Sequence, residues 1–298
     1  RPGTADTRSP TRSLARDASW PGPPARKEKP WADPATRSNL LAQQERGVHV
    51  LGPAVGEQAC GDVGPGRMLE PAQLLEALVD LFGRGRYAGR KVVLTAGPTR
   101  EALDAVRYLG NRSSGKMGYA IADALLREGA DLTLVSGPVA LAPPQGANTV
   151  SVESAQQMHD RVMAAVADAN LFIACAAVAD YRPARVAAHK IKKDSDTLSV
   201  ELVRNPDILR DVAARKDRPF CVGFAAETQD LEHYAENKRR DKGVDMIAAN
   251  LVGEHKGFES DDNALLVLWE GGSVRLPQQP KSSLAEHLVS LIADRLAW

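Results

Sequence analysis

Strand-like and helix-like segments alternate through residues 90–298, and this alternation restricts the chain to a small set of folds. Two strand-helix-strand units in succession predict a parallel sheet, because each helical crossover returns the chain to the same end of the sheet. Such units form the core of Rossmann-like domains. We therefore predict an α/β fold: a Rossmann-like, doubly wound, mostly parallel sheet with helices on both faces. The first strands and helices are expected at 91–97, 117–129, 131–138, 154–169 and 171–180.

The other segments extend this pattern in both directions. Later strands are expected at 198–203, 219–228 and 245–250, with a polar helix at 231–243, a hairpin at 264–276 and a final helix at 283–298. Before residue 90 we expect a capped helix at 33–47, a strand at 48–53, a glycine-rich loop at 57–68 and a helix at 70–85. The string GRGRYAG, at 83–89, precedes a strand and is interpreted as a helix terminator and linker.

Residues 1–30 differ in composition from the rest of the chain. They hold six prolines and seven Arg or Lys residues against three acidic ones, without apolar periodicity. This segment is predicted to be disordered. Its Arg and Ser content resembles a transit peptide, but its prolines would interrupt the amphipathic helix that such a peptide forms.

Charge and cysteine content argue against several classes of partner. Lys plus Arg equals Asp plus Glu at 38 each, so a net charge of zero gives no electrostatic case for nucleic acid or an anionic membrane. The three cysteines, Cys60, Cys175 and Cys221, lack metal-site spacing, and their odd number fits a reducing compartment. No apolar run approaches the roughly 18 residues of a membrane span. We predict a cytoplasmic protein with no nucleic-acid or membrane partner and no metal site made by side chains.

The run GNRSSGK, from Gly110 to Lys116, has the spacing of a P-loop but departs from one in two respects. Met117 replaces the Ser or Thr that would bind Mg²⁺, and twelve residues separate Gly110 from the strand that ends near Gly97. A long connection at a strand's carboxyl end still favours a binding role, so we predict a different kind of phosphate loop before the next helix. An ordinary connection with a serine cap is the alternative. The predicted phosphate-loop residues are Ser113, Ser114, Gly115 and Lys116.

A basic segment follows the strand predicted at 171–180. Asp180 is at the carboxyl end of that strand, and the cations after it are Arg182, Lys190, Lys192 and Lys193. A solvated charge run is one interpretation. The alternation in HKIKKD and the rigid Arg-Pro upstream favour another, an extended arm that carries a lysine over the site as a mobile counter-charge for phosphate.

Two further strings, NPDIL at 205–209 and GFAAET at 223–228, lie next to predicted strands. The polar helix that follows carries Lys238 and Lys242, which share one face because they are four residues apart. The pair is either a surface charge stripe or two cations that point at the terminal phosphates of a nucleotide.

Eight strings, taken in order, resemble one family. They are TAGPTRE, NRSSGKMGYAIA, LVSGP, AAVADYRP, KIKK, NPDIL, VGFAAET and GFESDDNAL. Residues 90–298 thereby resemble phosphopantothenate cysteine ligase, the carboxyl-terminal half of the bifunctional bacterial flavoprotein of coenzyme A biosynthesis. The resemblance implies a homodimer with the region from AAVADYRP to KIKK at the interface.

The resemblance also implies a CTP-dependent ligation, with Mg²⁺ on the triphosphate. The carboxylate of 4′-phosphopantothenate would attack the α-phosphate of CTP and release pyrophosphate. The amine of cysteine would then displace CMP from the acyl cytidylate, giving phosphopantothenoylcysteine. The preference for CTP over ATP rests on the resemblance alone, since a base is often recognised by backbone groups.

Roles for individual residues follow from the same resemblance. Asn111 and Lys190 are the expected catalytic residues, and Asn111 is expected to hold the acyl intermediate. The backbone amides of Ala176 and Ala177 are expected near the pantothenate. The expected nucleotide contacts are Ala174, Asp180, Lys190, Pro206, Asp207, Ile208, Leu209, Phe224, Lys238 and Lys242.

Residues 31–89 resemble only the end of the flavoprotein decarboxylase half. Cys60 falls on that family's proton donor, but its Pro-Ala-Met-Asn motif is replaced by Pro24-Ala25-Arg26-Lys27, and the flavin-binding strands and active-site histidine have no counterparts. We predict a truncated remnant without FMN or decarboxylase activity. Three alternatives stay open: an FMN-dependent decarboxylase, a non-catalytic nucleotide-binding protein, and a dinucleotide oxidoreductase, although no G-x-G-x-x-G follows the first strand.

Overall fold

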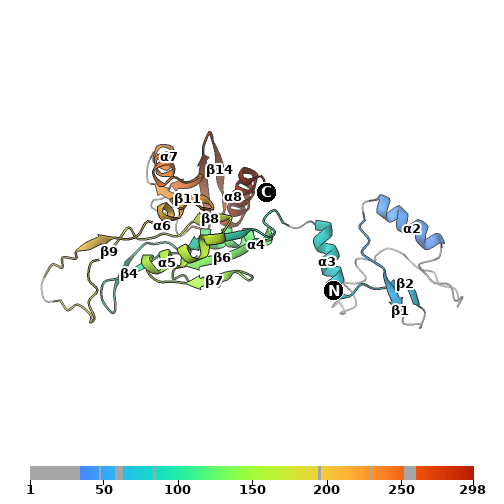
Figure 1. Ribbon diagram of the computed structural model, residues 1–298, viewed down its shortest axis with the longest axis horizontal. Helices are drawn as coiled ribbons and strands as arrows, with labels where there is room; N and C mark the ends of the chain where they lie inside the picture. Colours follow the sequence, from blue (N-terminus) through green and yellow to red (C-terminus); the bar gives the residue numbers. More distant parts are fainter. Residues whose placement is uncertain are drawn as a thin grey trace, which may run out of the picture. The chain divides into compact units, whose positions relative to one another are not determined.

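The computed structural model divides into two units, 1–83 and 84–298 (Figure 1). The predicted disorder of residues 1–30 and the predicted proton donor Cys60 fall outside the part of the chain that the structure describes. That part comprises residues 34–46, 48–57, 63–82, 85–193, 196–227, 230–251 and 260–298.

In the amino-terminal unit both predicted helices are confirmed, as α2 (Pro34–Glu45) and α3 (Pro71–Phe82). The predicted strand at 48–53 is wrong, because that stretch has no regular structure. An antiparallel pair follows it, β1 (Ala54–Glu57) with β2 (Val63–Arg67). Pro53 has no amide hydrogen to donate to a strand partner, which explains why the pairing starts after it. β2 lies within the loop predicted at 57–68, so that prediction is wrong for these residues. Their glycines and proline conceal the alternation that would have indicated a strand.

The second unit is built on one eight-stranded sheet with the order β14-β13-β12-β11-β8-β3-β6-β7. The strands from β7 to β12 are parallel to their neighbours, whereas β13 and β14 are antiparallel. Numbered along the chain, the parallel strands are ordered 3-2-1-4-5-6, which is the doubly wound arrangement and confirms the predicted fold class. The strands are β3 (Lys91–Ala96), β6 (Asp131–Ser136), β7 (Asn148–Ser151), β8 (Leu171–Ala174), β11 (Phe220–Glu227), β12 (Met246–Leu251), β13 (Asp262–Trp269) and β14 (Gly272–Pro280).

Helices cover both faces of this sheet. On one face α4 (Lys116–Arg127) and α8 (Lys281–Leu296) pack over side chains such as Leu94. On the other face, α5 (Ala155–Ala165), α6 (Ile208–Ala213) and α7 (Leu231–Lys242) pack over the alternate side chains. A short 3₁₀ helix, η2 (Val166–Asp168), follows α5. The predicted start of α5 is confirmed by a capping box between Ser154 and Gln157.

The amino terminus of α4 lies against the end of β3 because of two glycines. A β-carbon on Gly118 would lie 2.6 Å from the β-carbon of Ala96, so only glycine allows this approach. Gly115, and not a serine, is the cap residue, at a φ of 77° that favours glycine. The first turn of α4 is therefore held at the carboxyl end of the central strand.

Two of the strands predicted in this unit are wrong in extent. The apolar run at 171–180 forms a strand only as far as Ala174, where its pairing with β11 ends. The run predicted as a strand at 198–203 does not join the main sheet; β10 (Leu202–Arg204) pairs instead with β9 (Tyr181–Pro183). The large apolar side chains of this second run are exposed, so its composition indicates neither burial nor a place in the main sheet.

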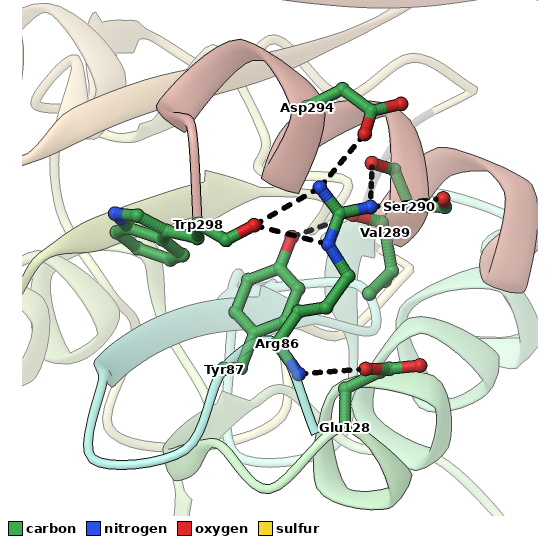
Figure 2. A network of polar contacts seen from close by, with 7 residues as sticks. All are labelled: Arg86, Tyr87, Glu128, Val289, Ser290, Asp294 and Trp298. Carbon is green, nitrogen blue, oxygen red and sulfur yellow. Dashed lines mark hydrogen bonds and ion pairs between the residues drawn. The ribbon is translucent and has the colours of Figure 1, made fainter. Parts of the chain in front are cut away.

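The segment before β3 is part of the fold and not a linker (Figure 2). Tyr87 is fully buried, and its hydroxyl donates to the carbonyl oxygen of Val289 at 2.7 Å. The Arg86 side chain contacts the end of α8, donating to Asp294 at 2.7 Å and to the Trp298 carbonyl at 3.2 Å. The interpretation of GRGRYAG as a linker is therefore corrected. The linker interpretation missed the role of Tyr87, because its partner Val289 is 202 residues away in the sequence.

Replacing Tyr87 with phenylalanine is expected to lower the free energy of unfolding by about 1 kcal/mol, because a buried carbonyl loses its hydroxyl donor. Urea unfolding measures this difference. Tyr234 lies on α7 and is 43% exposed, so Tyr234→Phe serves as the control, with an expected change within about 0.5 kcal/mol. Equal effects of the two substitutions would contradict the stabilising role of the Tyr87 hydroxyl.

Candidate functional site

The carboxyl ends of β3 and β8 meet where the strand order reverses, and open α/β sheets bind ligands at this switch point. The long connection after β3 contains a small hairpin, β4 (Arg100–Ala102) with β5 (Tyr108–Gly110). This hairpin and the β9–β10 pair extend side by side from the main sheet (Figure 1). Asn111, Asp180 and Lys190 lie next to these strands or between them. The other predicted nucleotide contacts lie on β8, β11 and α7 and at the start of α6.

Asn111 is brought to the chain that follows β8. Its side-chain amide donates to the carbonyl oxygen of Ala177 at 3.0 Å. The backbone amide of Thr99 donates to the same oxygen at 3.2 Å, and the buried Thr99 hydroxyl accepts from the amide of Ala179 at 3.0 Å. The base of the β4–β5 hairpin and the segment at 177–179 therefore form one connected structure.

The amides of Ala176 and Ala177, expected near the pantothenate, have acceptors within the protein. Ala176 donates to the Thr95 hydroxyl at 3.3 Å, and Ala177 donates to the carbonyl oxygen of Gly97 at 2.9 Å. These bonds hold the segment on β3. A ligand could use either amide only by displacing its present acceptor.

The predicted phosphate loop leads directly into α4. The Ser113 hydroxyl accepts from the amide of Gly115 at 3.3 Å, and the helix begins at Lys116. The Lys116 ammonium donates to Asp261 at 2.6 Å, and Asp261 is 88% exposed. Because an ion pair this exposed contributes at most about 1 kcal/mol, Lys116 could exchange Asp261 for a phosphate. The partial positive charge of the helix terminus would favour that exchange.

Lys281 is a second cation near this terminus, and the sequence interpretation missed it. It is only 6% exposed, and its ammonium donates to the carbonyl oxygen of Ser260. Burial lowers the pKa of Lys281, and the positive charge of Lys116 lowers it further. Its position could have been recognised, because Lys281 continues the buried stripe of α8 through Leu284 and Leu288 at helical spacing.

The two lysines of α7 face the loops of the sheet and do not form a solvated stripe. The Lys238 ammonium donates to the carbonyl oxygen of Phe224 at 3.0 Å, and Lys242 pairs with Asp207. Asp207 is in turn the cap of α6, accepting from the amide of Arg210 at 3.1 Å. Four predicted nucleotide contacts are thus joined in two pairs: Lys238 with Phe224 of β11, and Lys242 with Asp207 at the start of α6.

Lys238 lies in a mixed electrostatic environment. Burial lowers the pKa of Lys238, and the neighbouring Lys242 acts in the same direction. The carboxylates of Glu227, Asp180 and Asp207 act in the opposite direction. Asp180, from the end of the β8 segment, therefore adds to the negative charge around Lys238.

Two of the predicted nucleotide contacts have side chains that face the core. Ile208 and Leu209 are 5% and 8% exposed and lie with Val212 on the buried face of α6. Their side chains therefore anchor the NPDIL turn, and only backbone groups there could contact a nucleotide. The neighbouring Pro206, like Phe224 and Ala174, is partly buried.

Lys190 lies in the segment between β9 and β10 and is exposed. The backbone on either side of Lys190 is held by the turn between β4 and β5. The amide of Ala187 donates to the Leu103 carbonyl at 3.2 Å, and the amide of Ile191 donates to the Asp104 carboxylate at 3.0 Å. The predicted extended arm is therefore a defined segment, and it is docked on the same connection that carries Asn111.

The two ribbons also carry most of the exposed apolar surface of this unit. Among the described residues of 84–298, Tyr234 is the one large exposed hydrophobic side chain that lies elsewhere. We call the others the ribbon patch. They are Val106, Tyr108, Leu109, Tyr181, Val186, Leu198, Val200, Leu202 and Val203.

The fold and this site define the class of the second unit: a doubly wound α/β domain with glycines and lysines gathered around its switch point. The chain belongs to the family described as the DNA/pantothenate metabolism flavoprotein C-terminal domain, whose model matches residues 87–296.

Within the described residues, no helix is long and apolar enough to cross a membrane, and no three His, Cys, Asp or Glu residues cluster as metal ligands would.

Relatives of known name support this membership. The chain is 52% identical over 277 residues to the coenzyme A biosynthesis bifunctional protein CoaBC of Vibrio cholerae, an alignment covering 92% of this chain and 69% of that protein. It is 48% identical over 278 residues to CoaBC of Escherichia coli K12, covering 91% and 68%.

Solved structures agree with the fold. The C-terminal domain of a CoaBC superposes with a TM-score of 0.62 at 39% identity, covering 72% of this chain and 98% of that domain. An H337A variant of Cab2 in complex with phosphopantothenate-cysteine gives a TM-score of 0.57 at 16% identity, covering 76% and 95%, and at that identity it supports the fold alone.

Replacing Asp207 with asparagine should separate its two roles, because asparagine caps a helix as well as aspartate does but cannot form the ion pair with Lys242. Burial alone would raise the pKa of Asp207, but hydrogen bonds from Lys242 and the Arg210 amide hold it below its usual value. Such a carboxylate contributes stability that is complete above the unfolded-state pKa of about 4 and is lost as pH falls through the folded-state pKa.

We therefore expect Asp207→Asn to be less stable than the wild type at pH 7 by up to about 1 kcal/mol, with the difference shrinking as pH falls below about 4. Urea unfolding between pH 7 and pH 3 measures this, with the exposed Asp123→Asn on α4 as the control. A difference that stays constant with pH would show that the ion pair is not its source.

Proposed function

We propose that residues 84–298 form a phosphopantothenate cysteine ligase domain of coenzyme A biosynthesis, which uses CTP to join 4′-phosphopantothenate to cysteine. The observation that carries the proposal is the meeting of the motif residues at one sheet edge. Asn111 bonds to Ala177, Lys238 to Phe224, and Lys242 to Asp207. The family membership and the name of the CoaBC relatives support the same pathway.

In the proposed reaction the pantothenate carboxylate oxygen forms a bond to the α-phosphorus of CTP as the bond to the β-phosphate oxygen breaks, and pyrophosphate leaves. The cysteine amine then attacks the acyl carbon, loses a proton, and CMP leaves with the electron pair of the broken bond. Both steps need placement and neutralisation of negative charge more than acid–base groups. A site of lysines and helix-terminal amides suits that need.

Each charged group has a proposed part. Lys190, on the docked arm, would stabilise the charge that develops on the phosphates. Lys238 and Lys242 would neutralise the terminal phosphates, and the first turn of α4 with Lys116 would bind a further phosphate group. The Asn111 amide would hold the acyl cytidylate, because it lies next to the chain that follows β8.

Mg²⁺ enters this proposal with the triphosphate. The carboxylates near the lysines do not suit a protein-held metal ion, since Asp207 is paired with Lys242 and the described residues hold no cluster of three or more His, Cys, Asp or Glu. Bound to CTP, the ion would supply further charge neutralisation. The preference for CTP rests on the family resemblance.

We also propose that the ligase domain is a homodimer formed through the ribbon patch. Large apolar side chains gathered on two ribbons are typical of a surface that another chain covers. Leu202 is 45% exposed on β10, and Leu202→Lys is expected to convert a dimer into a monomer in sedimentation velocity. Tyr234→Lys, outside the patch, should leave the dimer intact. A monomeric wild type, or a dimeric Leu202→Lys variant, would contradict this interface.

The ligase activity is tested by pyrophosphate release from CTP with phosphopantothenate, with and without cysteine. Lys190→Ala is expected to lower kcat by about 100-fold, because it removes a charge that acts on the transition state. Asn111→Ala is expected to lower amide formation more than pyrophosphate release, because the intermediate is no longer held. Lys216→Ala, an exposed lysine away from the site, is the control. No pyrophosphate from the wild type under either condition would refute the proposal.

A further inference from the structure

The turn between β4 and β5 is organised around one carboxylate. Asp104 is 3% exposed and accepts through one oxygen from the amides of Val106 and Arg107, each at 2.8 Å. Its other oxygen accepts from the Arg107 guanidinium, at 3.0 and 2.6 Å, and from the amide of Ile191 at 3.0 Å. A carboxylate buried to this degree is costly unless its acceptor positions are satisfied, and here they are.

Ile191 is held through both of its backbone groups. Its amide donates to Asp104, and its carbonyl oxygen accepts from the Arg107 guanidinium at 2.9 Å. The Ala187 amide donates to the Leu103 carbonyl on the other side of Lys190. The backbone around Lys190 is thus fixed at residues 187 and 191, while the lysine side chain itself is exposed.

The same hairpin carries Asn111. β5 (Tyr108–Gly110) joins Arg107 to Asn111, and four residues of extended chain span about 13 Å. Asn111 is fixed at the hairpin base by its bond to Ala177, and Ile191 is fixed at the hairpin tip. One two-stranded ribbon therefore sets the separation between the Asn111 loop and the Lys190 segment.

We propose that Asp104 is a positioning residue, whose carboxylate, together with Arg107, holds the Lys190 segment at a fixed distance from Asn111. The proposal rests on the ligase function for the role of Lys190 but not for the docking itself. Asp104 does not act on substrate; it acts through the backbone of Ile191. A purely local role, in shaping the 103–107 turn, predicts different results in the two experiments that follow.

The docking is tested without any activity measurement, by limited trypsin digestion of the full chain. Trypsin needs an extended, unbound backbone on both sides of the cut, so the bonds to Ile191 protect the peptide bond after Lys190. Asp104→Asn retains an acceptor for the turn amides, but its side-chain NH₂ cannot accept from Ile191. We expect cleavage after Lys190, Lys192 or Lys193, identified by mass spectrometry, to be at least tenfold faster than in the wild type or in Asp123→Asn.

If Asp104→Asn is digested throughout the chain, Arg107→Lys decides the matter. Lysine keeps the positive charge but lacks the fork that reaches both Asp104 and the Ile191 carbonyl. It should accelerate the same cuts selectively. Unchanged cleavage after Lys190–Lys193 in the folded variant would overturn the proposal, whether or not the protein is a ligase.

The functional consequence is tested by combining Asp104→Asn with Lys190→Ala. Asp104→Asn alone is expected to lower kcat for pyrophosphate release at least tenfold, with a smaller change in KM. Because Asp104 acts through Lys190, the double variant should be no slower than Lys190→Ala alone. Multiplicative losses would overturn the positioning role. Absence of pyrophosphate release from the wild type would refute the ligase function and leave the digestion result to judge the docking.

Discussion

The site depends on how the chain leaves β8. After Ala174 the chain loses its partner on β11 but stays bound to the end of β3, through the amide of Cys175 on Thr95 and the amide of Ala177 on Gly97. This one-sided attachment opens the switch point, because it turns the segment away from β11 and exposes its other edge. Three residues from other loops bond to this segment. Asn111 and Thr99 donate to the carbonyl oxygen of Ala177, and Asn205 donates to that of Ala179. Without it, the loops of β3 and β8 and the loop before α6 would have no common attachment.

Charge in the site is balanced within the protein before any ligand binds. Lys242 is paired with Asp207, Lys116 with Asp261, and Lys238 with a carbonyl oxygen among neighbouring carboxylates. Two unit charges 4 Å apart at an effective dielectric constant of 20 attract by about 4 kcal/mol, and a triphosphate presents several such charges where Asp261 or Asp207 presents one. A polyanion would therefore compete well for these lysines. The same balance is consistent with the zero net charge of the chain.

The sequence allowed the doubly wound sheet and most of its helices to be predicted, because buried strands and amphipathic helices have distinct periodicities. The ends of elements were less predictable. The run from Leu171 to Ala179 is apolar throughout, yet its strand ends at Ala174, where the pairing with β11 ends, and no local pattern encodes that. Ile208 and Leu209 lie in a recognised motif but serve the core. Asp104 was missed because its role depends on Ile191, which is 87 residues away. The burial of Lys281 was missed although its spacing from Leu284 and Leu288 indicates it.

The two ribbons illustrate how one contact can serve several purposes. Each consists of two strands of three residues, and an isolated pair of that size is marginally stable in water. The bonds from Asp104 and Arg107 to Ile191 join the first ribbon to the segment between β9 and β10. The apolar side chains of the ribbon patch are thereby presented on one structure and not on two independent ones. A partner chain that covered the patch would bind a surface already ordered, and it would lose less conformational entropy on binding than if it had to order both ribbons.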